Sequence, residues 1–196
     1  MVTMSQVDPD AALMVRVRKG DRDAFRQLVE RHQRTVISVI YRSLGDRWEA
    51  EDLAQRVFVQ VYRSAKRYKP TAKFTTWLFT IVHNTVLNEH RRRARHAAES
   101  LEAMQPRSDT GDSPWQFADE RMSNPAEEAA EREVQAKILE AVKRLPDAQR
   151  TAVLLCRYHG ESYEEIARVL GCTVGAVKSL LHRARQTLKD ELKGLY

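Results

Sequence analysis

The sequence has 196 residues, 42% of them hydrophobic, which is enough for one domain or for two small domains with real cores. Its 33 Lys and Arg residues exceed its 27 Asp and Glu residues, and the formal net charge of +6 favours an anionic partner such as nucleic acid or an acidic protein surface. The two cysteines form no CxxC pair, so a zinc module is not expected. The N-terminal residues do not have the basic-then-apolar pattern of a signal sequence, and no apolar run approaches the roughly 18 residues that cross a bilayer. We therefore expect a cytoplasmic protein that does not insert into a membrane.

Charge is unevenly distributed along the chain. Residues 1–98 carry 19 Lys/Arg against 10 Asp/Glu, residues 99–133 carry 3 against 10, and residues 134–196 carry 11 against 7. Two basic blocks therefore flank an acidic one. The distribution of charge is therefore more informative than its sum.

The first block has the periodicity of three amphipathic helices. Asp21 can cap a helix whose apolar residues recur from Phe25 to Ile40. A second run follows over Leu53–Tyr62, and a third extends from Phe74 to about His96 without Gly or Pro. We therefore expect a helical domain over residues 10–97.

Residues 98–129 predict an acidic flexible linker, because Pro, Ser and Gly interrupt any helical period there and acids dominate. Helical periodicity resumes near Ala126 and continues to Leu145. Asp147 is expected to cap a further helix that Gly160 ends. The expected fold class is all-α, with two small helical domains and the second one over residues 130–194.

The second domain carries a helix-turn-helix pattern. Ser162 and Glu165 have the spacing of a capping box, and Gly171 permits a tight helix end. Thr173 can cap a second, longer helix with one apolar stripe. The opposite face of that helix offers hydrogen-bond donors suited to base edges and phosphates in a major groove, although a solvated helix also carries charges: Gly175, Lys178, Ser179, His182, Arg183, Arg185 and Gln186.

The third helix of the first domain carries a polar and basic stripe. On a helical wheel Asn88, Arg91 and Arg95 lie within about 40° of Asn84, with Arg92 beside them. Such a stripe suits separated DNA strands. Trp77 lies at its edge, where stacking on an exposed base and packing in the core are both open.

The loop before this helix interleaves cations with aromatic residues. It contains Arg63, Lys66, Arg67, Lys69 and Lys73 together with Tyr68 and Phe74. This composition favours single-stranded nucleic acid over a merely solvated loop, which would need only the cations.

Catalysis is not expected, and neither a cofactor nor a metal is predicted. Glu49, Glu51 and Asp52 are acidic, but positions one and two apart on a helix do not converge on one ion. His32 shares a stripe with Phe25 and is interpreted as a packed histidine. One alternative function is that of a conventional helix-turn-helix regulator, which binds duplex DNA without polymerase. This function would not explain the polar and basic stripe at Asn84–Arg95.

The ordered motifs resemble the extracytoplasmic-function group of bacterial sigma factors in the sigma-70 family. The first domain carries the resemblance in Asp23-Ala24-Phe25, in Glu51-Asp52-Leu53-Ala54-Gln55 with Val57-Phe58, and in Phe74, Trp77-Leu78, Ile81 and Asn84. The second domain carries it in Ser162-Tyr163-Glu164-Glu165-Ile166-Ala167, in Val174-Gly175-Ala176-Val177-Lys178-Ser179 and in Arg183-Ala184-Arg185. It spans residues 10–95 and 130–192.

This resemblance implies three partners and assigns residues to two of them. The partners are core RNA polymerase, through its clamp helices and flap, promoter DNA, and an anti-sigma factor. Residues implied at the polymerase are Glu51, Asp52, Gln55 and Arg56, the last at a position where the family more often has an acid. Residues implied at the minus-ten element are Arg63, Lys66, Arg67, Lys73, Phe74, Trp77, Asn84, Asn88, Arg91, Arg92 and Arg95. Residues implied at the minus-thirty-five element are Thr173, Gly175, Lys178, Ser179, His182, Arg183 and Gln186.

The acidic linker either mimics the charge of the transcript or serves as a solvated tether, and both interpretations stay open.

Overall fold

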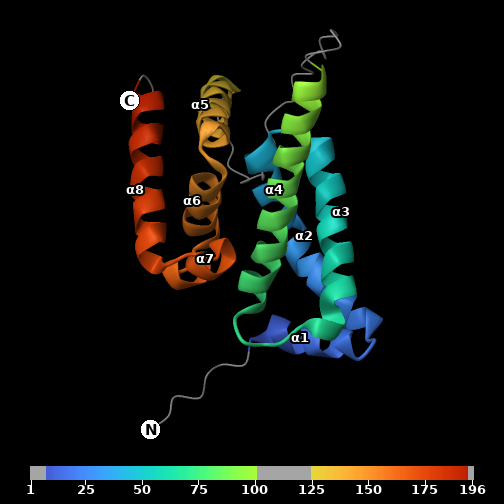
Figure 1. Ribbon diagram of the computed structural model, residues 1–196. Coiled ribbons are helices and arrows are strands. Elements are labelled where there is room, and N and C mark those ends of the chain that lie inside the picture. Colours follow the sequence, from blue (N-terminus) through green and yellow to red (C-terminus); the bar gives the residue numbers. More distant parts are fainter. Residues whose placement is uncertain (1–7, 101–124, 194–196) are drawn as a thin grey trace.

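The structure is a computed structural model that describes residues 8–100 and 125–193. Every regular element in these two ranges is helical, and none of their helices is long and apolar enough to cross a membrane. The expected all-α class with two small domains is therefore confirmed (Figure 1). The linker core predicted from composition lies largely outside the described residues.

The first domain packs four α-helices and a short 3-10 turn around one apolar core. They are α1 (Pro9–Arg18), α2 (Arg22–Leu44), α3 (Arg47–Ser64), η1 (Ala65–Arg67) and α4 (Phe74–Ser100). The core includes Met14, Leu28, Ile40, Val57 and Leu78. Helix α1 lies across the end of the bundle (Figure 1) and was not predicted from the sequence.

Local capping explains where these helices begin and end. The Asp21 carboxylate accepts the Ala24 N–H, as predicted, and Asp46 accepts the Glu49 N–H at the start of α3. Between α2 and α3, Gly45 adopts a left-handed conformation with φ of 79°, which permits the sharp turn. At the start of α1, the Asp8 carboxylate accepts the N–H groups of Asp10 and Ala11, and Pro9 occupies the first helical position.

The second domain contains α5 (Pro125–Arg144), α6 (Asp147–His159), α7 (Tyr163–Leu170) and α8 (Val174–Glu191). The prediction that Asp147 caps α6 is wrong, because Pro146 occupies the cap position and no side chain caps this helix. Asp147 is the first helical residue instead, and its carboxylate lies 3.4 Å from the Arg150 guanidinium. Gly160 ends α6 in the left-handed region, as predicted.

Helices α7 and α8 form the predicted helix-turn-helix. The Ser162 hydroxyl accepts the Glu165 N–H, and the Glu165 carboxylate accepts the Ser162 N–H, so the capping box is confirmed. Gly171 ends α7 with φ of 62°, and Thr173 caps α8 by accepting the Ala176 N–H.

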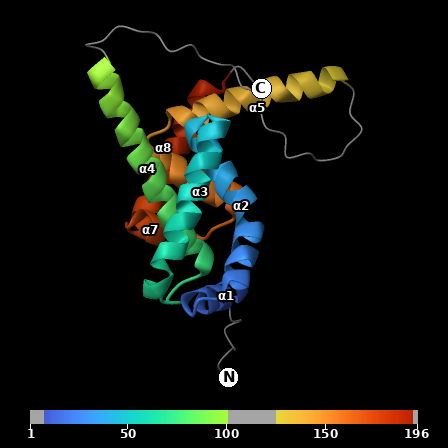
Figure 2. The same cartoon turned by 90° about the vertical axis from the view of Figure 1, so that its right-hand side faces the viewer.

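The two domains pack against each other in this structure. Helix α4 lies between the second domain and the α2–α3 pair, with α7 against its first half (Figure 1). Helix α2 contacts α5 and α6, while the first part of α5 projects away from the body (Figure 2).

Candidate nucleic-acid interface

A cleft of about 640 Å³ separates α3 from α4. Asn84 and Asn88 are exposed on its α4 wall, where Thr85 and Ile81 complete the lining. The α3 wall carries Asp52, Gln55, Arg56, Val59, Gln60 and Arg63. Residues that the family resemblance assigns to polymerase and to the minus-ten element thus line one cleft, with amide donors on both walls and guanidinium donors on the α3 wall.

Basic residues extend this surface along the second half of α4. Arg91 and Arg95 are exposed, one turn apart. Arg92 differs from them, because its guanidinium donates to both carboxylate oxygens of Glu89 at 2.8 to 3.0 Å through Nε. Among the residues that the structure describes, Arg92 is bound to the buried Glu89, whereas neither Arg91 nor Arg95 forms an ion pair.

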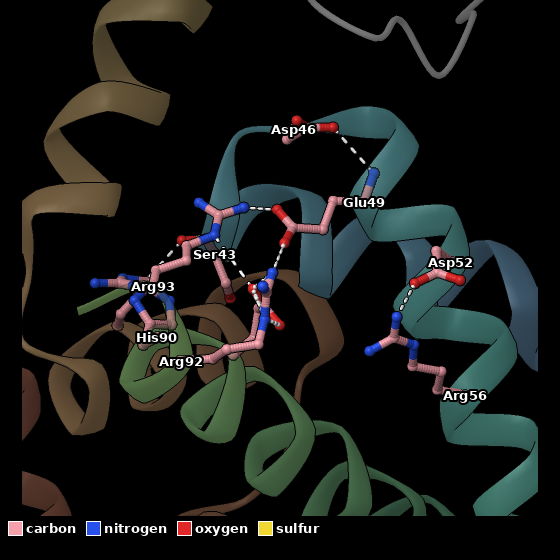
Figure 3. A network of polar contacts seen from close by, with 10 residues as sticks. Ser43, Asp46, Glu49, Asp52, Arg56, His90, Arg92 and Arg93 are labelled. Atoms are coloured by element: carbon pink, nitrogen blue, oxygen red, sulfur yellow. Dashed lines mark hydrogen bonds and ion pairs between the residues drawn. The ribbon is translucent and has the colours of Figure 1, made fainter. Parts of the chain in front are cut away.

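An ion-pair network ties this part of α4 to the start of α3. Arg92 and Arg93 both reach Glu49, Arg92 at 3.6 Å and Arg93 in direct contact (Figure 3). Glu89, with only 4% of its side chain exposed, lies under both guanidinium groups. Hydrogen bonding to Glu89 raises the pKa of Arg92, so that guanidinium stays charged. The network therefore joins the two helices that form the walls of the cleft.

The loop between α3 and α4 separates its cations from its aromatic rings. Lys66, Arg67 and Lys73 are exposed, as is Arg63 in the last turn of α3. Phe74, in contrast, is fully buried, so its ring does not lie on a DNA-facing surface as expected from the sequence.

Those aromatic rings belong to the core instead. The Phe74 ring lies 5.2 Å from the His32 ring and 6.4 Å from Tyr68, between centroids. Tyr68 is 2% exposed, and burial together with Asp8 and Asp10 raises its pKa to about 12. The aromatic rings therefore close the end of the bundle, whereas the cations of the loop face solvent. His32 is packed, as interpreted, and its Nε2 lies 2.8 Å from Asp10.

Trp77 occupies an intermediate place. Its ring packs against Tyr68 at 4.9 Å and against Phe74 at 5.9 Å, yet the residue stays partly exposed. Both readings of Trp77 are compatible with this position, since the inner edge is in the aromatic cluster and the outer edge is on the surface.

The reading face of α8, which is the side of the helix predicted to contact DNA, is exposed to solvent. Val177, Leu181 and Ala184 are buried, and they turn the opposite side of the helix outward. The residues expected to face DNA are all exposed: Thr173, Gly175, Lys178, Ser179, His182, Arg183 and Gln186. Such an unobstructed polar face on the second helix of a helix-turn-helix suits a major groove.

The candidate polymerase-facing residues occupy the outer side of α3. Asp52 pairs with Arg56 at 2.8 Å (Figure 3). Glu51 pairs with Arg47 at 3.2 Å, and Gln55 is exposed. Asp52 and Arg56 thus neutralise each other in part, which lowers the negative potential expected of this surface.

A groove between α2 and α3 was missed by the sequence reasoning. It encloses about 540 Å³, and its apolar lining includes Phe25, Val29, Ile37, Val59 and Tyr62. Val59 is 48% exposed and Tyr62 45% exposed, high values for large apolar side chains. The available signal was the width of the apolar face of α3, where Val57, Phe58, Val59, Val61 and Tyr62 are more than one buried stripe can cover.

No group of three or more His, Cys, Asp or Glu side chains that could hold a metal occurs within residues 8–100 and 125–193. The acidic residues at the start of α3 are each engaged otherwise, with Glu49 on the α4 arginines and Asp52 on Arg56.

Comparison with known proteins explains why these two surfaces occur in one chain. Residues 28–96 match the Sigma-70 region 2 family, and residues 135–188 match the Sigma-70 region 4 family. The fold and its two exposed surfaces therefore define a promoter-recognition protein of the sigma-70 type.

Relatives along the whole length narrow this class. The chain is 34% identical to the RNA polymerase sigma-H factor of Pseudomonas aeruginosa, with 100% of this chain and 98% of that protein covered. It is 32% identical to the ECF RNA polymerase sigma-E factor of Escherichia coli K12, with 98% of each covered. The chain belongs to the extracytoplasmic-function RNA polymerase sigma factors. It is thus an alternative sigma factor that directs transcription initiation, and the conventional-regulator alternative is not favoured.

Solved structures share the fold. The sigma factor RpoE from Bartonella quintana, in complex with the anti-sigma factor NepR, superposes with a TM-score of 0.67 at 24% identity, over 87% of this chain and 97% of that one. CnrH in complex with the cytosolic domain of CnrY superposes with a TM-score of 0.66, over 95% and 98%.

Proposed function

We propose that the cleft between α3 and α4 takes the minus-ten element as separated strands. The observation that carries this proposal is the exposure of Asn84 and Asn88 inside a cleft that Arg63 also lines. Amides can hydrogen-bond base edges, while Arg63, Arg91 and Arg95 hold phosphates. Lys66, Arg67 and Lys73 supply further phosphate contacts, and Trp77 offers its exposed edge to one base. Arg92 positions the helix through Glu89 and Glu49, and Phe74 supports the cleft from within the core.

The exposed face of α8 reads the minus-thirty-five element in the major groove. Arg183 and Gln186 lie at its centre and reach base edges, while Lys178 holds the backbone. Thr173, Gly175, Ser179 and His182 complete the contact surface. Recognition is non-covalent throughout, and the polymerase does the chemistry.

The α2–α3 groove and the neighbouring outer side of α3 dock on core polymerase. Gln55 and Glu51 provide polar contacts in the groove, and Val59 and Tyr62 provide apolar area. Asp52 adds a polar contact from the neighbouring α3 wall of the cleft. Arg56 tunes this surface through its pair with Asp52. Binding to polymerase would place the chain at work in the cytoplasm.

An anti-sigma partner is proposed to compete for the same docking surface and to cover both domains. NepR and CnrY are each in complex with their sigma factors, which provides the precedent. The acidic segment between the domains acts either as a transcript mimic or as a tether, and neutralising Asp109, Asp112, Asp119 and Glu120 distinguishes the two through promoter escape.

Reconstituted transcription tests the proposal. The purified chain is added to bacterial core polymerase with linear genomic fragments, and promoter-specific transcripts are mapped. Asn84→Ala and Arg183→Ala should each lower transcript yield by about tenfold or more, as expected when a base contact worth about 1–3 kcal/mol is lost. Lys189→Ala, at an exposed position beyond the reading face of α8, is the matched control and should transcribe like the wild type. Equal yields from all four proteins would rule out these reading surfaces.

A further inference from the structure

One face of α4 holds the second domain by side chains at successive helical turns. Phe79 lies 5.2 Å from the His159 ring, between centroids, and His83 Nδ1 lies 3.0 Å from the Thr151 hydroxyl. His90, two turns further along α4, contacts Arg150. Residues 79, 83 and 90 share one face of the helix, opposite the wall that carries Asn84 and Asn88.

Arg150 is the centre of this interface. Its side chain is only 7% exposed, and it donates to the Ser43 carbonyl at 3.0 Å and to the Leu145 carbonyl at 2.7 Å. Its Nη1 lies 2.8 Å from Nε2 of His90. One guanidinium thus joins the end of α2, the middle of α4 and the joint between α5 and α6 (Figure 3 shows Ser43 and His90).

The contact between Arg150 and His90 requires a neutral imidazole. A guanidinium has only donors, so Nε2 must accept, and the ring proton must lie on Nδ1. Protonation of Nε2 would place a second N–H donor and a second positive charge 2.8 Å from Nη1. The hydrogen bond would then become a repulsion.

We propose that the Arg150–His90 contact is a proton-operated lock between the two domains: neutral His90 keeps the free chain closed, and protonated His90 releases the second domain from α4. The lock explains why a charged residue is buried at a domain interface where apolar packing would otherwise suffice. A buried arginine with fixed partners specifies one arrangement, and it tolerates the loss of a partner poorly.

Each charged group that faces the lock has a defined place. On α6, the Asp147 carboxylate lies 3.4 Å from Arg150 and 3.8 Å from His90 Nδ1, so it attracts a protonated imidazole but is nearer to the arginine. On α4 itself, Glu89 is taken up by Arg92 and Arg93. Helix α2 presents the Ser43 carbonyl, and α5 ends at the Leu145 carbonyl. Burial and Arg150 lower the pKa of His90, against the smaller opposite effects of Asp147 and Glu89.

Closure matters because it sets the distance between the two reading helices. Helix α4 packs on α7 and α7 packs on α8, so two packing steps of about 8–10 Å put the axes of α4 and α8 about 20 Å apart. Elements centred at minus ten and minus thirty-five are separated by 25 base pairs, or about 85 Å along the duplex. The closed chain cannot reach both, so opening must precede recognition. This consequence rests on the proposed function, whereas the lock itself does not.

Energy transfer in the free, full-length chain tests the lock. A donor on Arg34→Cys in α2 and an acceptor on Lys189→Cys in α8 report the domain separation, in a background where Cys156 and Cys172 are Ala. Transfer should be high near about pH 8 and should fall as the pH is lowered to about 5, where imidazole charges. His90→Gln, whose amide oxygen can still accept from Arg150, should keep high transfer across this range. His90→Arg, with a permanent charge, should show low transfer throughout.

Two controls keep the outcome decisive. His182→Gln, on the exposed face of α8, should follow the wild type. Far-UV circular dichroism must stay constant while transfer falls, since a parallel loss of helix would mean unfolding and would overturn the lock. Unchanged transfer in the wild type, or an equal pH response in His90→Gln, would also overturn it. The energy-transfer experiment contains no polymerase, so its outcome does not depend on whether the chain directs promoter-specific transcription.

Discussion

Lys73 and Glu165 join the two domains by an ion pair of 2.6 Å. Lys73 belongs to the loop proposed to hold minus-ten phosphates, and Glu165 belongs to the capping box of α7. Burial alone would raise the pKa of Glu165, but hydrogen bonds from Lys73, Glu161 and Ser162 outweigh it and lower this pKa to about 2. The Glu165 carboxylate therefore caps α7 and also pairs with Lys73, a cation that the proposed contact with DNA requires.

Glu165→Gln separates these two roles, because glutamine still completes a capping box but carries no charge. We expect the helix-turn-helix to stay folded and Lys73 to become available. The affinity of the free chain for single-stranded minus-ten DNA should rise severalfold, and its dependence on salt should steepen by about one counterion. Fluorescence anisotropy across a salt series measures both. Lys73→Ala in the same background should cancel the gain, and a gain that survives would assign it elsewhere.

Glu161 makes the same end of the interface sensitive to pH. Burial, followed by its hydrogen bond with Glu165, raises the pKa of Glu161 from its usual 4.5 to about 7. A raised carboxyl pKa means that folding favours the protonated form, so stability is present at about pH 4.5 and declines as the pH rises through 7. We expect this decline to cost on the order of 2 kcal/mol once solvent screening is allowed for.

Thermal unfolding of the wild type and of Glu161→Gln measures that decline. The stability difference between the two proteins should favour the variant increasingly between about pH 5 and pH 8. Parallel curves would show that Glu161 ionises freely. Glu164→Gln, on the exposed side of α7, is the control and should leave the pH dependence unchanged.

His159 has the opposite pH dependence. Burial, with a smaller contribution from Arg42, lowers its pKa from 6.5 to about 4. Folding favours the neutral ring, so this contribution to stability is present above pH 6.5 and is lost as the pH falls toward 4. His159→Phe should therefore flatten the acid side of the stability curve while keeping the contact with Phe79, and urea unfolding at several pH values tests this. An unaltered acid limb would place the titration on another group.

Local chemistry was readable from the sequence where the determinants are neighbours. Ser162, Gly171 and Thr173 act within one helical turn of themselves, so the helix-turn-helix and its capping could be predicted. The exposed faces of α4 and α8 followed from helical periodicity alone. The same local signals were present at Asp8 and Pro9, and α1 was missed although its N-terminal signature is complete.

Contacts between distant segments could not be read in this way. Arg150 donates to Ser43, 107 residues earlier, and nothing in the periodicity of α6 distinguishes it from a solvated arginine. Phe74 was assigned to DNA because it sits among cations in the sequence. Its burial depends on His32 and Tyr68, which only the folded bundle brings to it.

Because the Phe74 ring lies in the core, removing it should lower the stability of the first domain. Phe74→Ala removes a fully buried ring and should lower the free energy of unfolding by about 3–5 kcal/mol. Lys66→Ala, in the same loop but exposed, should leave unfolding unchanged within about 0.5 kcal/mol and reduce single-strand binding instead. Urea titrations and anisotropy distinguish the two effects. If Phe74→Ala were as stable as the wild type, the ring would not belong to the core.

The α2–α3 groove makes the sharpest prediction about polymerase, because its central side chains are apolar and exposed. Val59→Asp introduces a charge that docking would have to desolvate without a partner, so affinity for core polymerase should fall at least tenfold, the equivalent of about 1.4 kcal/mol. The substitution lies on the surface, so unfolding should change little. Val134→Asp is the matched control, since Val134 is 37% exposed on α5, away from the groove. Competition of labelled wild type from core polymerase compares the two variants directly. An equal loss in both would assign the effect to added charge, and no loss in Val59→Asp would move the docking surface away from this groove.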